Sequence, residues 1–134
     1  MSAPHDHAAD AAAADRALAG ESGELAEFRR FRERMNAEIL GENNLVINRF
    51  FNLDGRAYEA GALDVRTKEL LGLVASLVLR CDDCITYHIV RCREEGVTRE
   101  ECYEAFNVAL VVGGSITIPH LRRAAEMLDE VEKM

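Results

Sequence analysis

The chain has 134 residues, of which 49% are hydrophobic and 30% charged, so it has the size and the apolar content of one globular domain. Its formal net charge of -8 argues against sequence-independent nucleic-acid binding, which needs clustered Lys and Arg against phosphate. No apolar run approaches the ~20 residues that a membrane helix needs. We therefore expect neither nucleic acid nor a membrane as a partner.

The start of the chain is rich in alanine and poor in large apolar side chains. We predict a flexible tail at residues 1–20 and a single domain at residues 21–134. The tail lacks the basic start and the apolar core of a secretory signal, so the simplest expectation is a cytoplasmic protein. Structural disulfides are not expected in that reducing compartment. The chain has four cysteines, Cys81, Cys84, Cys92 and Cys102.

Apolar side chains in the first half of the remaining sequence recur at steps of three and four residues, which predicts helices. The first helix should run from Gly23 to Leu40, and Gly41 is a suitable stop. Asn43 and Asn44 can cap a second helix. A loop is expected from 52 to 61.

Two later segments are apolar on nearly every side. Asp64 can cap the first of them, which should run to about Leu79. Thr98 and Glu101 have the spacing of a capping box for the second, which Gly113 and the glycine after it should end. Because helices of this kind are buried on most sides, one small domain cannot cover both unaided. We therefore predict a homo-oligomer.

Two further helices complete the pattern. One should start at Cys81 or Asp82 and end near Gly96, and the last should have Pro119 in its first turn and run to about Glu132. No alternating strand pattern is present in the sequence. The fold class predicted is all-α, a helical bundle of about six helices.

The segment that begins at Cys81 carries the residues most suited to chemistry. On a helix, Cys81, Cys84 and His88 would project from one face, because residues three, four and seven apart are stacked neighbours. A thiol in the first turn of a helix has a lowered pKa and tends to form the reactive thiolate. His88, one turn after Cys84, can accept the thiol proton or stabilise the thiolate charge. This pattern indicates thiol redox chemistry.

The two thiols are expected to have different roles, because His88 lies one turn after Cys84 rather than Cys81. Cys84 is the expected attacking thiol, and Cys81 is well placed to resolve it by forming a short-range disulfide. The reverse assignment is also compatible with the sequence. The plainest alternative is that both are buried cysteines that behave as small apolar residues. Zinc would need a fourth ligand beyond two thiols and an imidazole, so no metal site is predicted.

Glu69 is a further candidate, twelve residues before Cys81. On one continuous helix the two would be about 18 Å apart. If the chain instead reverses near Arg80, Glu69 comes within about one turn of His88. A carboxylate beside a long apolar run can gain a proton-shuttle role. The alternative is a solvated residue near a helix start.

Cys92, Cys102 and His120 are expected to have structural roles. Cys92 and Cys102 have no partner by spacing and are expected in the core. His120 follows a proline at a helix start, where capping or an interface is expected before catalysis.

The run from Arg66 to His88 resembles the AhpD-like branch of the carboxymuconolactone decarboxylase family. That branch has a glutamate, a CxxC motif twelve residues on, and a histidine four residues after the second cysteine. Here these are Glu69, Cys81, Cys84 and His88. The resemblance implies an AhpD-like helical subunit that assembles into homotrimers or homohexamers. It also implies a thiol-dependent peroxidase in which the glutamate and the histidine relay protons to the cysteine pair.

The resemblance further implies that the only redox group is the Cys81–Cys84 disulfide, with no separate cofactor. The substrate would be a peroxide or a disulfide, and the reductant a dithiol such as a lipoyl group on a partner protein. Some relatives have a histidine just before the second cysteine, where this chain has Asp83; the change makes the local field more negative and opposes thiolate formation. The family also contains cofactor-free lactone decarboxylases, so such a lyase is the second hypothesis and a non-catalytic helical assembly protein the third.

Overall fold

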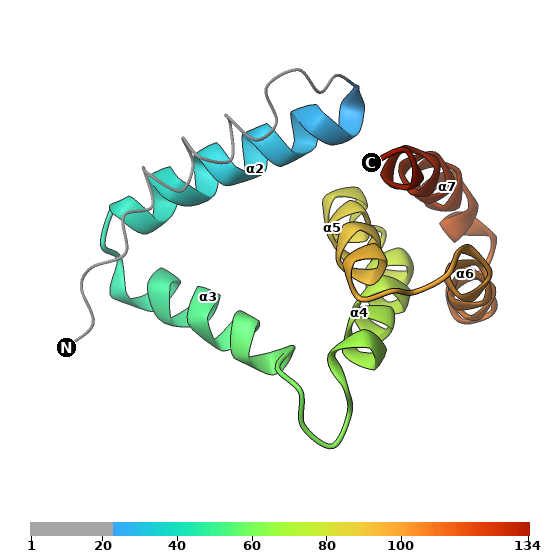
Figure 1. Cartoon of the computed structure of the whole chain (residues 1–134), viewed down its shortest axis with the longest axis horizontal. Helices are drawn as coiled ribbons and strands as arrows, with labels where there is room; N and C mark the ends of the chain where they lie inside the picture. Colours follow the sequence, from blue (N-terminus) through green and yellow to red (C-terminus); the bar gives the residue numbers. More distant parts are fainter. Residues whose placement is uncertain (1–22) are drawn as a thin grey trace. The chain divides into compact units, whose positions relative to one another are not determined.

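The structure, a computed structural model, describes residues 23–134 (Figure 1). The described residues form six α-helices and one short 3-10 helix and contain no strand, which confirms the all-α prediction. The predicted flexible tail at residues 1–20 lies outside the described residues. Among the described helices, none has both the length and the apolar character needed to cross a bilayer.

The chain divides into two compact units between Ala57 and Tyr58. The first unit contains α2 (Glu24–Gly41) and α3 (Leu45–Ala57). The second contains α4 (Val65–Leu79), α5 (Asp82–Glu94), α6 (Arg99–Gly113), η1 (Ser115–Thr117) and α7 (Ile118–Glu132). The single domain expected at residues 21–134 stays a prediction.

In the first unit, the second helix is longer than the sequence indicated. The side chain of Asn44 accepts hydrogen bonds from the backbone N–H groups of Val46 and Ile47, each at 3.1 Å, as a helix cap does. The loop expected from 52 to 61 is wrong in its first half, because α3 continues to Ala57. Gly55 costs a helix only about 1 kcal/mol relative to alanine, which is too little to end it here. None of the residues of α3 is buried.

In the second unit, α4 begins and ends at recognisable caps. The Asp64 carboxylate accepts from the backbone N–H of Thr67 at 2.7 Å. At the other end, Arg80 adopts the left-handed conformation with φ of 62°, and the N–H groups of Arg80 and Cys81 bond to the carbonyls of Leu77 and Ser76. The chain therefore reverses at Arg80, as predicted, and α5 runs back beside α4.

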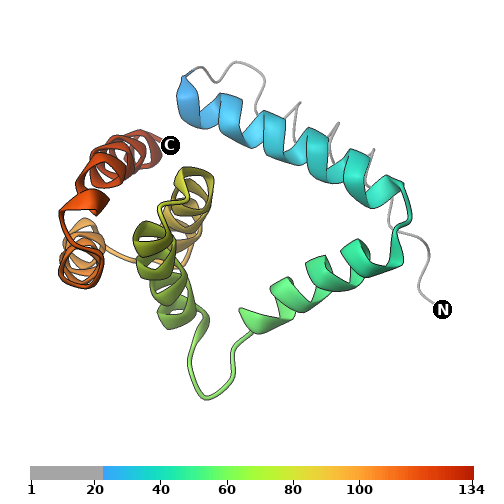
Figure 2. The same cartoon turned by 180° about the vertical axis from the view of Figure 1, so that it is seen from behind.

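The core of the second unit lies among its four long helices. In it, α4 packs against both α5 and α6, and α5 also packs against α7 (Figure 1, Figure 2). The predicted capping box at Thr98 and Glu101 is present and starts α6. This packing fixes α5, which begins with the cysteine pair, between two neighbours. The largest fully buried apolar side chains are Leu73, Leu77, Ile85, Ile89, Phe106, Val97 and Val131.

Candidate active site

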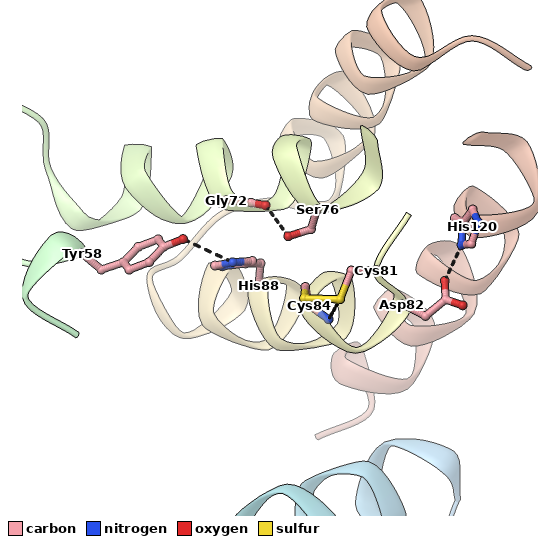
Figure 3. The surroundings of a disulfide bond; sticks show 8 residues. All are labelled: Tyr58, Gly72, Ser76, Cys81, Asp82, Cys84, His88 and His120. Atoms are coloured by element: carbon pink, nitrogen blue, oxygen red, sulfur yellow. Dashed lines mark hydrogen bonds and ion pairs between the residues drawn. A yellow bond between two sulfur atoms is a disulfide. The ribbon is translucent and has the colours of Figure 1, made fainter. Parts of the chain in front are cut away.

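The cysteine pair forms the N-terminal end of α5. Cys81 is the N-cap residue, and its Sγ accepts a hydrogen bond from the backbone N–H of Cys84 at 3.3 Å (Figure 3). The two sulfurs are joined in a disulfide, with the Cα atoms 5.2 Å apart. Cys84 is exposed and Cys81 is half-buried. Cys84 is therefore the more accessible residue of the pair. The unpaired amide groups of the helix end stabilise a negative charge on either sulfur once the pair is reduced.

Because the chain reverses at Arg80, Glu69 of α4 lies in contact with His88 of α5. Glu69 Oε2 lies 2.8 Å from Nδ1 of His88, and the Glu69 side chain is only 1% exposed. The solvated alternative for Glu69 is therefore wrong. Its other oxygen, Oε1, accepts from Nε of Arg91 at 3.4 Å. Burying a carboxylate costs free energy unless it is paired and hydrogen-bonded. His88 and Arg91 provide these partners for Glu69.

The second ring nitrogen of His88 faces Tyr58. The Tyr58 hydroxyl lies 3.4 Å from Nε2, and the imidazole is turned toward it in Figure 3. An ionised Glu69 only accepts, so Nδ1 of His88 donates to it, and in the neutral ring Nε2 accepts from the Tyr58 hydroxyl. Within the described chain, His88 has no hydrogen bond to either sulfur. The direct exchange of a proton between His88 and Cys84 stays a prediction.

Gly72 of α4 makes room for this chain of hydrogen bonds. A Cβ at this position would lie 2.5 Å from Cε1 and 2.7 Å from Nε2 of His88, and 2.8 Å from the Tyr58 hydroxyl. Any side chain would therefore displace the imidazole or the phenol. Sequence reasoning missed both Gly72 and Tyr58. A glycine inside an otherwise apolar helix was an available signal of close approach, whereas Tyr58 follows α3 with no local pattern to mark it.

A second histidine lies beside the start of α5. Nδ1 of His120, on α7, is 2.7 Å from Oδ1 of Asp82 (Figure 3). Nε of Arg123 is 3.7 Å from Oδ2 of the same carboxylate. Asp82 directly follows Cys81 in the chain. His120 was expected to cap a helix or line an interface, which stays a prediction; the structure shows it in contact with a neighbour of the cysteine pair.

The two remaining cysteines are buried and reduced, as predicted for core residues. Burial raises the pKa of the Cys92 thiol to about 12 and also raises the pKa of Cys102. Thiols of this kind are almost fully protonated at neutral pH, and the protonated form is a poor nucleophile. Within the described residues, no group of three or more His, Cys, Asp and Glu side chains is arranged to hold a metal ion.

The part of the sequence that carries this site matches a known family. The model of the carboxymuconolactone decarboxylase family matches residues 45–127, which is more than half of the chain and includes every site residue described above. The chain belongs to the carboxymuconolactone decarboxylase family. This confirms the family that the spacing of Glu69, Cys81, Cys84 and His88 implied and is consistent with its AhpD-like branch.

Solved structures of family members share the fold. TM1620 from Thermotoga maritima is 57% identical with a TM-score of 0.78, over 81% of this chain and 95% of that one. A second structure of that protein describes it as a family member suggested to take part in an antioxidative response. The apo form of lpg0406 from Legionella pneumophila is 26% identical with a TM-score of 0.76, over 82% of this chain and 98% of that one.

A curated relative is also similar. The uncharacterized protein 4 in the cox locus of Paracoccus denitrificans is 35% identical over 83 residues, which are 62% of this chain and 75% of the relative. Its description gives no activity. The family is therefore shown by sequence, whereas the reaction has to be argued from the site.

The close approach at Gly72 gives a first prediction. The variant Gly72→Ala should lower the free energy of unfolding by about 1–3 kcal/mol, the usual cost of overpacking, despite the better helix propensity of alanine. Gly55→Ala is the matched control, since Gly55 also lies inside a helix but has no atom within 4 Å of the place that a Cβ would occupy. That control should gain up to about 1 kcal/mol. Urea unfolding at one protein concentration measures both, and equal gains in the two variants would contradict the steric argument.

The contrast between the two kinds of cysteine gives a second prediction. After reduction with dithiothreitol, iodoacetamide should modify Cys81 and Cys84 in the folded protein and leave Cys92 and Cys102 unmodified, because only the first two can form accessible thiolates. Intact mass should show two additions under native conditions and four in denaturant. Comparable labelling rates at Cys92 and Cys84 would show that burial does not protect the core thiols.

Proposed function

We propose that this protein is a thiol-dependent peroxidase or disulfide reductase of the AhpD type. The observation that carries the proposal is the position of Cys84, an exposed residue paired with Cys81 at the N-terminus of a helix whose next turn holds His88. The amide groups of the helix end favour the thiolate, and exposure gives a substrate access to it. Family membership and the antioxidative description of the Thermotoga relative support the same class of reaction.

The reaction proceeds in three steps. The Cys84 thiolate attacks the outer oxygen of a hydroperoxide, the O–O bond breaks, and the departing alkoxide takes a proton and leaves as an alcohol. Cys84 is then a sulfenic acid. The Cys81 thiolate attacks the Cys84 sulfur, hydroxide leaves and takes a proton as water, and the disulfide forms. An external dithiol reduces the disulfide by exchange, supplying two electrons and two protons.

In this cycle, protons are transferred by the buried, hydrogen-bonded side chains of Glu69 and His88. Glu69 holds Nδ1 of His88 at 2.8 Å, which orients the ring. In its protonated form, the imidazole can deliver a proton from Nε2 toward the departing oxygen. The Tyr58 hydroxyl, 3.4 Å from Nε2, keeps that nitrogen hydrogen-bonded between turnovers. In this proposal Cys84, Cys81, His88 and Glu69 are the catalytic residues.

The proposal needs no cofactor beyond the disulfide. A lipoyl group on a partner protein is the proposed reductant, because its two thiols can reduce an exposed disulfide by exchange in one encounter. A cytoplasmic location is part of the same proposal, since a reducing compartment keeps the dithiol supplied.

The roles of the two cysteines give a third prediction. Cys84→Ser should lower peroxide consumption with dihydrolipoamide at least about a hundredfold, because the attacking sulfur is gone. Cys81→Ser should form one sulfenic acid per chain, which dimedone traps, and then stop. Cys102→Ala is a control, since Cys102 is buried and lies on α6 rather than at the start of α5.

Other outcomes identify the competing hypotheses. Sulfenic acid on Cys81 in the Cys84→Ser variant would reverse the assignment of the two thiols. Equal peroxide consumption by wild type and Cys84→Ser would overturn the proposal. Turnover of a small carboxylated lactone by the variant that lacks both cysteines would instead support a decarboxylase.

We also propose that the subunit assembles into a homotrimer or a homohexamer. A groove with a volume of about 720 Å³ runs between α4 and α6. Exposed apolar side chains surround it, including Leu71 at 54% exposed and Val108 at 53%. Contiguous apolar surface of this kind is rare on monomers and marks an interaction surface. The further apolar members of the groove are Leu70, Val74, Val78, Leu79 and Val112.

The apolar groove gives a fourth prediction. A charge in its wall should weaken assembly, because burying an unpaired carboxylate is costly. In sedimentation equilibrium, Val108→Asp should shift the mass toward that of the 14.9 kDa subunit. Asn107→Asp places the same charge on the neighbouring exposed residue of α6, outside the groove, and should leave the mass unchanged. A wild-type protein that sediments as a monomer would refute the proposed assembly.

A further inference from the structure

The proposed reaction does not use the cluster of His120, Asp82 and Arg123. Asp82 is the first residue of α5, directly after Cys81, and α7 supplies both of its partners. His120 Nδ1 lies 2.7 Å from Oδ1 and Arg123 Nε 3.7 Å from Oδ2. In Figure 3 the carboxylate points to His120 and away from the disulfide. The His120 side chain is 23% exposed and that of Asp82 41%, so the hydrogen bond is partly shielded from water.

The direction of this carboxylate matters for the charge at the sulfurs. The first turn of α5 contains two acidic residues, Asp82 and Asp83. Carboxylates near a thiol oppose thiolate formation, whereas the amide groups of the helix end favour it. The same amide groups would also attract a free Asp82 side chain, because acids in the first turn are stabilised there. A carboxylate not held by α7 could therefore turn toward the amide groups of the first turn, of which the N–H of Cys84 now bonds to the Cys81 sulfur.

We propose that His120 is a positioning residue that acts through Asp82 and sets the reduction potential of the Cys81–Cys84 pair. Its hydrogen bond holds the carboxylate against α7, and Arg123 balances part of the charge. The amide groups at the start of α5 then remain free to stabilise negative charge on the sulfurs. A stabilised thiolate favours the reduced form of the pair, which raises its potential and makes the disulfide easier to reduce. The inference rests on the redox role proposed above.

The effect can be measured without peroxide or a partner protein. The full chain is equilibrated at pH 7 in buffers of reduced and oxidised dithiothreitol, quenched by alkylation, and the fraction of disulfide is read by mass. His120→Ala should change the equilibrium constant for reduction severalfold, up to about tenfold, toward the disulfide. A tenfold change corresponds to about 30 mV for this two-electron couple.

Three further variants separate positioning from a general structural role. His120→Asn keeps a donor near the position of Nδ1 and should restore a potential close to that of the wild type. Asp82→Asn removes the charge, so adding His120→Ala to it should cause no further shift. Arg122→Ala is the matched control, because it removes an exposed charge from the same helix with no ion pair to Asp82. It should leave the potential unchanged.

The possible results are distinct. Equal reduction potentials for wild type and His120→Ala would overturn the inference. It would also be overturned if His120→Ala shifted the potential equally in the wild-type and in the Asp82→Asn background. A shift of the same size in Arg122→Ala would also overturn it, because the effect would then be one of net charge. If the wild-type pair forms no reversible disulfide, the proposed function fails together with the inference. If the wild type titrates normally and the variants match it, only the inference fails.

Discussion

The hydrogen bond between Glu69 and His88 connects the two helices on which the candidate site is built. Glu69 is almost fully buried on α4, and a carboxylate in that position requires donors. His88 and Arg91, both on α5, provide them at 2.8 Å and 3.4 Å. Removing either donor would leave a buried charge without full compensation, a change that typically destabilises a protein strongly. The pair therefore sets how α5 lies along α4, and with it where the first turn of α5 points.

The remaining features of the site follow from this contact. The imidazole can lie against α4 only because residue 72 is a glycine, and its free nitrogen then meets the Tyr58 hydroxyl. One turn before His88, at the N-terminal end of α5, the cysteine pair occupies the cap and the first turn. One helix thus carries an acid–base group in a buried environment and a thiol in an exposed one, one turn apart. Thiol chemistry requires both, since the sulfur must meet the substrate while the proton donor stays ordered.

The sequence predicted most of the helices and the approach of Glu69 to His88, for identifiable reasons. Helix boundaries such as Asp64, Thr98 and Gly113 depend on local chemistry that a few neighbouring residues reveal. The meeting of Glu69 and His88 was predictable because only a short turn at Arg80 separates two regular helices. Tyr58, Gly72 and the contact of His120 with Asp82 were not predicted, because they depend on how three helices pack. The length of α3 was misjudged because its polar residues and Gly55 resemble a loop but cost a helix little.

The turn that precedes Cys81 has a consequence for motion during a redox cycle. Before Cys81, its own N–H bonds to the carbonyl of Ser76 at 3.1 Å; after it, the N–H of Ile85 bonds to the carbonyl of Cys81 at 2.9 Å. Neither of these two bonds involves a sulfur atom, whereas the N–H of Cys84 bonds to the Cys81 sulfur at 3.3 Å. Opening the S–S bond therefore leaves the two carbonyl-accepted bonds beside Cys81 in place. The main chain can stay in place while the thiols exchange electrons. In the proposed redox cycle, opening and closing of the disulfide then involves side-chain rotations of the two cysteines, which are fast compared with local unfolding.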